Sequence, residues 1–192
     1  TLDYHSMTAI QAQSLPAILE GKDLIGQAKT GSGKTAAFGL GLLNKLDVKK
    51  FRVQALVLCP TRELADQVAK ELRKLARAIH NIKVLCLSGG VPFGPQVGSL
   101  EHGAHIVVGT PGRIEEHLRK NNLSLNHLNT FVLDEADRML DSGFQDSLDA
   151  IIECLPEQRQ TLLFSATYPK KIQAIAERVT TDDVIKRLLE AV

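Results

Sequence analysis

The chain contains the sequence Asp23-Leu24-Ile25-Gly26-Gln27, followed at once by Ala28-Lys29-Thr30-Gly31-Ser32-Gly33-Lys34-Thr35. An apolar run of strand length leads into a glycine-rich turn, and a stretch of helical period continues through Leu46. Gly31 and Gly33 allow backbone N–H groups to turn inward, and the start of the helix adds partial positive charge. This order of strand, turn and helix predicts a loop that cradles phosphate oxygens.

Two side chains of this loop carry the predicted chemistry. Lys34 is expected to neutralise the β- and γ-phosphates of a nucleotide, and the Thr35 hydroxyl to reach Mg²⁺. The usual pattern begins with glycine, where this chain has Ala28. A plain tight turn is the alternative, but the flanking strand and helix favour phosphate binding. The predicted nucleotide-binding residues of the loop are Ala28, Lys29, Thr30, Gly31, Ser32, Gly33, Lys34 and Thr35.

Further apolar runs alternate with stretches of helical period along the rest of the chain. The clearest helix is expected over 62–80, where Leu64, Val68 and Leu72 share one face. Repeated strand and helix units predict an α/β, doubly wound domain, with a mainly parallel sheet, helices on both faces and ligands at the carboxyl ends of the strands. Besides 23–27, the predicted strands are 54–59, 83–87, 105–108, 130–133 and 161–164.

Composition places the chain among ordinary globular proteins. Its 192 residues are 44% hydrophobic and 23% charged, which excludes a disordered or fibrous chain and suggests one domain. The net charge of +1 gives no attraction of the whole molecule to nucleic acid or membrane, so a site for a polyanion must arise locally. The apolar runs are short and no targeting segment is recognised, so we expect a soluble protein without a membrane partner.

The cysteines and histidines suggest no metal centre. Cys59, Cys86 and Cys154 are odd in number, widely spaced and set among apolar neighbours, which favours reduced thiols in the core over a disulfide or metal framework. A cytoplasmic location is the corresponding expectation. The six histidines lack ligand spacing, and we assign no metal site to them.

In addition to the phosphate loop, an acidic element is needed to hold the metal beside the phosphates. The sequence Phe131-Val132-Leu133-Asp134-Glu135-Ala136-Asp137 is an apolar strand that ends in acid. Asp134 is expected to position Mg²⁺ through its water shell, and Glu135 to orient and deprotonate the attacking water. With Lys34 they form the predicted catalytic set. The alternative interpretation is a solvated acidic cluster at the start of a helix. The presence of the phosphate loop in the same chain argues against it.

Asp134-Glu135-Ala136-Asp137 also spells the box that names the DEAD-box RNA helicases. Over residues 4–179 the chain resembles the first RecA-like lobe of that family, with the greatest similarity to its bacterial DbpA-type branch. The resemblance implies a P-loop NTPase fold and an ATP hydrolase that couples turnover to RNA duplex unwinding or to remodelling of RNA–protein complexes. ATP and Mg²⁺ are the implied cofactors, and RNA, including ribosomal RNA in ribosome biogenesis, is the implied partner.

The resemblance also assigns roles outside the phosphate loop. Gln11 would read the adenine edge, although Ala9 stands where the family usually has proline. Arg62 and Arg113 follow strand ends, where guanidinium groups can take phosphate oxygens without reading bases; taken singly, these segments are ordinary helix-capping turns. The implied RNA-backbone residues are Pro60, Thr61, Arg62, Gly89, Gly90, Thr110, Pro111, Gly112 and Arg113. The implied coupling residues are Asp137, Ser165, Ala166 and Thr167.

Two features of the family are not recognised in these 192 residues. The aromatic residue that stacks on adenine would precede Thr1, and nothing resembles the second RecA-like lobe with its arginine finger. We therefore expect residues 1–180 to form an ATP-binding lobe with a partial Q motif. Residues 181–192 space Val184, Ile185 and Leu188 like an amphipathic helix, to which we assign no role. An RNA clamp without unwinding, and an ATPase that acts on DNA or protein, stay open as alternatives.

Overall fold

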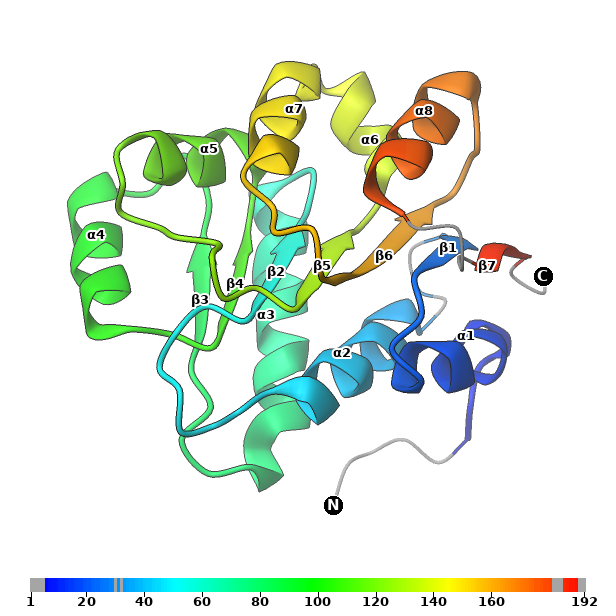
Figure 1. Cartoon of the computed structure of the whole chain (residues 1–192), viewed down its shortest axis with the longest axis horizontal. Coiled ribbons are helices and arrows are strands. Elements are labelled where there is room, and N and C mark those ends of the chain that lie inside the picture. The colour runs from blue at the N-terminus through cyan, green and yellow to red at the C-terminus, as the bar shows by residue number, and fades with distance from the viewer. Residues whose placement is uncertain (1–5, 30, 32, 181–184, 190–192) are drawn as a thin grey trace.

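The fold is built on one parallel sheet, seen in a computed structural model that describes residues 6–29, 31, 33–180 and 185–189. The strands of these residues follow the order β3-β4-β2-β5-β6-β1-β7, and every neighbouring pair runs parallel (Figure 1). The six predicted strands are confirmed, within one residue at each end. The strands are β1 (Leu24–Gln27), β2 (Ala55–Leu58), β3 (Val84–Leu87), β4 (Ile106–Gly109), β5 (Thr130–Leu133), β6 (Gln160–Ser165) and β7 (Ile185–Leu189).

Helices cover both faces of the sheet, as the doubly wound prediction requires. On one face lie α1 (Ala9–Leu19), α2 (Lys34–Lys45) and α3 (Arg62–Leu75). On the other lie α4 (Phe93–His102), α5 (Pro111–Arg119), α6 (Ala136–Asp141), α7 (Gln145–Glu153) and α8 (Lys170–Val179). This double cover explains why the strands read as continuous apolar runs in the sequence instead of alternating ones.

The two faces give the molecule two cores. Along β5, Val132 packs into the core beneath α1, α2 and α3, whereas Phe131 and Leu133 pack into the core beneath the other helices. Successive side chains of a strand point to opposite faces, so a buried strand supplies both cores in turn. The central strands are therefore held rigidly, and the loops at their carboxyl ends start from fixed positions.

The expected helix at the end of the chain is wrong where the structure describes it. Residues 185–189 form β7, which pairs parallel to β1 with Leu24 opposite Ile185 and Gln27 opposite Leu189. Residues 181–184 and 190–192 of that expectation lie outside the described residues. A helix this short has little stability of its own, whereas the edge of β1 offers unpaired backbone groups. Tertiary pairing therefore overrides the helical spacing of the apolar residues.

Two smaller expectations also need correction. The helix predicted over 62–80 ends at Leu75 and continues only as a 3₁₀ turn over Ala76–Ala78, which leaves Ile79 exposed. All three cysteines are free, but only Cys59 is fully buried; Cys86 is half-buried, and Cys154 is exposed at the end of α7. Among the described residues, no helix combines the length and the apolar character needed to cross a bilayer.

Candidate functional site

Apart from Gln11 in α1, the predicted motifs lie at one edge of the sheet, at the carboxyl ends of its strands. This follows from the parallel arrangement, because each loop that leaves a strand starts at the same edge. The phosphate loop follows β1, the acidic box follows β5, and the segment 165–167 ends β6 (Figure 1). The three segments assigned to RNA follow β2, β3 and β4. The sheet therefore gathers distant parts of the sequence into one continuous surface.

The phosphate loop is anchored by Gly33, the N-cap residue of α2. Its φ of +86° lies in the left-handed region that favours glycine. A Cβ atom there would lie 2.7 Å from both the Gln11 Nε2 atom and the Thr8 Oγ1 atom. Any larger residue would therefore push α1 away from the loop. Residues 30 and 32 of the predicted loop lie outside the described residues, while the Ala28 amide donates to the Ser165 carbonyl at 3.0 Å.

Gln11 joins α1 to this loop. Its Nε2 atom donates to the Gly33 carbonyl at 3.0 Å, and its Oε1 atom accepts from the Thr8 amide at 2.9 Å. Thr8 and Gln11 thus form a capping box, a feature that our sequence reasoning missed although threonine followed three residues later by glutamine is its signature. The structure places Gln11 at the phosphate loop, and its contact with adenine stays a prediction.

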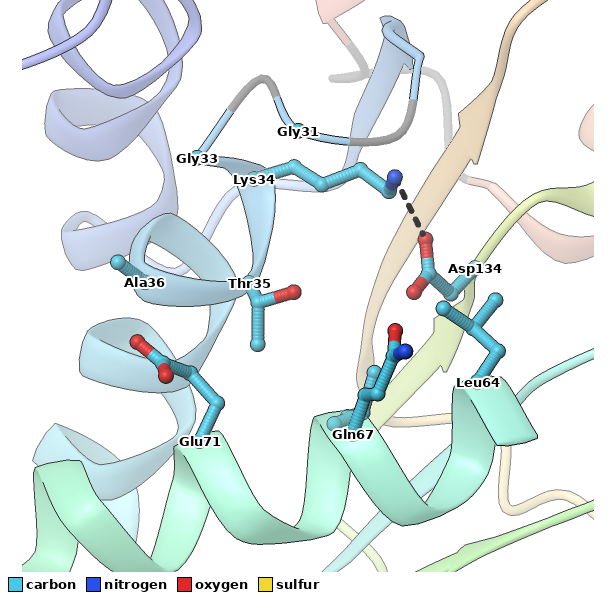
Figure 2. Close-up of a pocket in the computed structure, with 10 residues that line it drawn as sticks. Gly31, Gly33, Lys34, Thr35, Ala36, Leu64, Gln67, Glu71 and Asp134 are labelled. Atoms are coloured by element: carbon cyan, nitrogen blue, oxygen red, sulfur yellow. Dashed lines mark ion pairs between the residues drawn. The ribbon is translucent and has the colours of Figure 1, made fainter. Parts of the chain in front are cut away.

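The centre of the site is a buried ion pair between Lys34 and Asp134. The Lys34 Nζ atom lies 3.5 Å from the Asp134 Oδ1 atom, and the side chains are 5% and 1% exposed (Figure 2). Neither carboxylate oxygen makes a well-formed hydrogen bond with the described residues. Burial raises the pKa of Asp134 to about 6, although the Lys34 ammonium opposes this rise. An acceptor buried in this way is suited to an additional cation or its water shell.

The residues of this pocket fit a divalent cation held together with phosphate. Magnesium prefers oxygen ligands and keeps several waters, and both Asp134 and the Thr35 hydroxyl face the pocket (Figure 2). In the described part of the chain, no three acidic, His or Cys side chains gather into a group that could hold a metal alone. A cation bound here would therefore take its other ligands from phosphate and water.

The pocket has a second wall that sequence reasoning missed. It measures about 350 Å³ and lies between the phosphate loop and α3, whose residues Leu64, Gln67 and Glu71 line it (Figure 2). The helical period of 62–80 identified this helix, but only the packing of α2 against α3 brings it beside the loop. A polyphosphate in this pocket would meet the loop on one side and the Gln67 and Glu71 side chains of α3 on the other.

Asp134→Asn is expected to stabilise the ligand-free protein at neutral and alkaline pH. The pKa of Asp134 is about 6 in the folded state, whereas an unfolded aspartate titrates at about 3.9. Between these values the folded state binds more protons than the unfolded one, so the free energy of unfolding falls as the pH rises from about 4 to about 6.

Asp134→Asn has no buried carboxylate to ionise. Its free energy of unfolding should therefore exceed that of the wild type by on the order of 2 kcal/mol above about pH 7, and this difference should shrink toward zero near pH 4. Urea denaturation of both proteins across that range measures the difference. A difference in the free energy of unfolding that does not change with pH would contradict the raised pKa of the buried Asp134 carboxyl.

Glu135 occupies a strained position at the start of α6. Its φ of +53° and ψ of 54° are unusual for a residue with a side chain, and such strain is concentrated at functional sites. The side chain is buried, and its Oε1 atom accepts a hydrogen bond from the Arg138 Nη1 atom at 2.9 Å. This bond raises the pKa of Arg138. The sequence did not lead us to predict a role for Arg138; the only signal was its spacing of three residues from Glu135.

The predicted coupling residues contact one another. The Asp137 Oδ2 atom accepts from the Thr167 hydroxyl at 2.9 Å and from the Thr167 amide at 3.2 Å, while the Asp137 amide donates to the Ser165 hydroxyl. The Ala166 carbonyl accepts from the side chain of Gln27, at the end of β1. The acidic box, the end of β6 and the phosphate strand are thus directly connected.

The two predicted phosphate-binding arginines differ in their surroundings. Arg62 is exposed, and its nearest ion-pair partner is Asp66 at 4.0 Å. The Arg113 side chain is 14% exposed; its Nη1 atom donates to the Val91 carbonyl at 2.8 Å, and its Nε atom pairs with Glu116 at 3.2 Å. Arg62 is therefore the more accessible cation, while Arg113 is engaged largely within the protein. Contact of either residue with RNA stays a prediction.

The other residues assigned to RNA mostly shape the turns. Thr61 caps α3 by accepting from the Leu64 amide at 3.1 Å, and Pro111 is buried in the first turn of α5. The Gly89 amide donates to the Thr110 hydroxyl at 3.2 Å, so the loops after β3 and β4 are joined. Gly90 and Gly112 are exposed, and Pro60 is buried. These turns present backbone and small residues at the edge of the sheet.

The fold and the site together define a class of protein. A glycine-rich loop at a helix N-terminus, a buried Lys–Asp pair and an open pocket beside them are the features of a P-loop nucleotide-binding protein. The sequence profile of the family described as DEAD/DEAH box helicase matches residues 8–175. The chain belongs to the DEAD/DEAH box helicase family.

Individual relatives agree with this assignment. The chain is 63% identical over 181 residues to the ATP-dependent RNA helicase DbpA of Escherichia coli, covering 94% of this chain and 40% of that protein. It is 52% identical over 177 residues to the ATP-dependent RNA helicase CshA of Listeria monocytogenes, covering 92% and 34%. The crystal structure of a DEAD box protein from Methanococcus jannaschii superposes with a TM-score of 0.90 at 38% identity, covering 96% of this chain and 50% of that one. The chain thus spans about 40% or less of these two curated relatives.

Proposed function

We propose that residues 1–180 form the ATP-binding lobe of an ATP-dependent RNA helicase that couples ATP hydrolysis to unwinding of RNA duplexes or remodelling of RNA–protein complexes. The observation that carries the proposal is the buried Lys34–Asp134 pair beside an open pocket at the edge where the motif loops meet. The relatives named ATP-dependent RNA helicases support it. In this proposal Lys34 binds the β- and γ-phosphates, and Gln11 contacts adenine.

The acidic box would supply the chemistry of hydrolysis. Thr35 and Asp134 would hold Mg²⁺ partly through water, and the bound ion would spread the negative charge of the phosphates. Glu135 would orient the attacking water and accept its proton, and the hydrogen bond from Arg138 holds that carboxylate in place. Asp137, Ser165, Ala166 and Thr167 would transmit the state of this site toward the segments that hold RNA, because their contacts join β1, β5 and β6.

RNA would be gripped through its backbone at the same edge. The exposed Arg62 and the glycine-rich turns near Gly90 and Gly112 can approach phosphate oxygens without reading bases, so binding would not depend on sequence. A second RecA-like lobe would close over this surface and add an arginine finger. Ribosomal RNA as a target, a role in ribosome biogenesis and a cytoplasmic location belong to the same proposal. They rest on the resemblance to the DbpA-type branch and on the three free thiols.

A protein that carries both lobes provides the test. Its ATP turnover should rise on addition of RNA and much less on addition of DNA of the same sequence, and it should displace a strand from a short RNA duplex only when ATP is hydrolysed. Measurements at several salt concentrations should show weaker RNA binding as salt increases, because the contacts are to phosphates. Equal stimulation by DNA would favour an ATPase with another substrate, and RNA-stimulated turnover without strand displacement would favour a clamp.

A further inference from the structure

A buried polar cluster lies between α4 and α5, away from the nucleotide pocket. Its centre is Gln96, which is 7% exposed, and its neighbour His117 is fully buried. Buried polar side chains are costly unless their hydrogen bonds are satisfied, so a cluster that satisfies them defines one arrangement of the surrounding chain. Neither residue belongs to the predicted nucleotide or RNA sites.

The carboxamide of Gln96 makes three hydrogen bonds. Its Oε1 atom accepts from the Arg113 Nη1 atom at 3.1 Å and lies 2.8 Å from the His117 Nε2 atom. Its Nε2 atom donates to the Ser88 carbonyl at 3.2 Å. Arginine can only donate, so Oε1 must be the acceptor, and His117 must therefore carry its proton on Nε2. The bare Nδ1 atom of His117 then faces the Asn122 amide group, 3.4 Å away.

The cluster is sealed on its outer side by an aromatic ring. Phe93 stacks on His117 with ring centroids 4.3 Å apart and planes 9° apart, and the Lys120 Nζ atom lies 4.6 Å from the Phe93 centroid. Burial and the Arg113 guanidinium lower the pKa of His117. A lowered pKa favours the neutral imidazole, whose Nδ1 atom can accept a hydrogen bond from the Asn122 amide group.

Two of the three partners of Gln96, Ser88 and Arg113, lie at the functional edge, whereas His117 lies further along α5. Ser88 immediately precedes Gly89 and Gly90 after β3, and Arg113 lies in the first turn of α5, which follows β4. The same loops meet again where the Gly89 amide donates to the Thr110 hydroxyl and where Arg113 donates to the Val91 carbonyl. Gln96 lies behind both loops and is bonded to both at once.

We propose that Gln96 is a positioning residue for RNA binding, which holds the 88–91 loop and the 110–113 turn in one fixed arrangement before RNA arrives. The inference rests on the proposed RNA-binding function of these loops. Glycine-rich segments lose much conformational freedom when they are ordered, so a loop that is already ordered binds its ligand more tightly. Gln96 thus acts through the Ser88 backbone and the Arg113 side chain and not by touching RNA.

The test uses Gln96→Met, which keeps the length of the side chain and removes all three hydrogen bonds, in a protein that carries both lobes. Affinity for a single-stranded oligoribonucleotide, measured by fluorescence anisotropy, should fall about tenfold. The RNA concentration that half-saturates ATP turnover should rise by a similar factor, while turnover at saturating RNA and nucleotide affinity stay unchanged. Hydrogen exchange of the 88–91 amides should become faster. Ser99→Ala, which removes a hydrogen bond of the same helix to the Pro95 carbonyl, is the matched control.

A second variant covers the case in which Gln96→Met does not fold. His117→Phe keeps a ring against Phe93 and removes one of the three hydrogen bonds, so it should weaken RNA binding in the same way but by about threefold. Unchanged RNA affinity in a folded variant, or a loss of maximal turnover in place of RNA affinity, would overturn the inference and leave the proposed function intact. An equal effect of Ser99→Ala would overturn it as well. Failure of the wild type to bind RNA would overturn both.

Discussion

Lys34→Ala should weaken the binding of ATP and ADP by roughly 10²-fold or more, because the substitution removes the one cation buried at the centre of the described pocket. The neighbouring loop should keep its shape, since Gly33 is held by Gln11 and not by the lysine. The loss of Lys34 also leaves Asp134 without its counter-charge, so the pKa of that carboxyl should rise further. Isothermal titration calorimetry with each nucleotide in the presence of Mg²⁺ measures the effect.

Two further variants make this result interpretable. Lys34→Met retains most of the buried side-chain volume and should lose nucleotide affinity to the same extent, which separates charge from packing. Lys45→Ala changes a lysine at the far end of the same helix and should bind nucleotide like the wild type. Wild-type affinity in a folded Lys34→Ala protein would show that phosphate is bound elsewhere, and the proposed nucleotide site would have to be abandoned.

Glu135→Gln should reduce ATP turnover by roughly 10²-fold or more in a protein that carries both lobes, while ATP and RNA still bind. The amide oxygen of glutamine can accept the hydrogen bond from Arg138, so the side chain should stay where it is. What is lost is the ability to accept a proton. A protein that binds ATP without hydrolysing it should remain on RNA, and its dissociation from RNA should slow in the presence of ATP.

Single-turnover hydrolysis and RNA dissociation rates measure these two effects. Asp141→Asn removes an exposed carboxylate from the same helix and should leave both unchanged. Turnover of the Glu135→Gln protein within a few-fold of the wild type would assign the role of proton acceptor to another residue.

The parts of the site that are local in sequence could be predicted from it. The phosphate loop and the acidic box each lie within a few residues of a strand end, and buried parallel strands have a distinct apolar signature. The edge of the sheet that gathers the motifs follows from parallel topology alone. For this reason the amino-acid sequence is sufficient to predict strands β1 to β6 and the location of Lys34 beside the acidic box.

Contacts between distant segments could not be predicted in the same way. The bond from Gln11 to Gly33 spans 22 residues, and the bond from Arg113 to Val91 spans the same distance in the chain. Both hydrogen bonds depend on how the helices pack against the sheet, which the hydrophobic periodicity of the sequence does not specify. The inward engagement of Arg113 and the wall of the pocket formed by α3 are consequences of that packing. Strand β7 is the clearest case of a conformation that depends on a distant segment, because it forms by pairing with β1.

The direction of β7 has a consequence for whatever follows it in the chain. Because β7 runs parallel to β1, it travels from the far side of the sheet toward the edge that carries the phosphate loop. Leu189 is opposite Gln27, so β7 ends at the edge of the sheet from which the phosphate loop starts and not at the opposite edge. A tether that begins there shortens the path between a following domain and this surface, and the effective concentration of that domain at the surface rises accordingly.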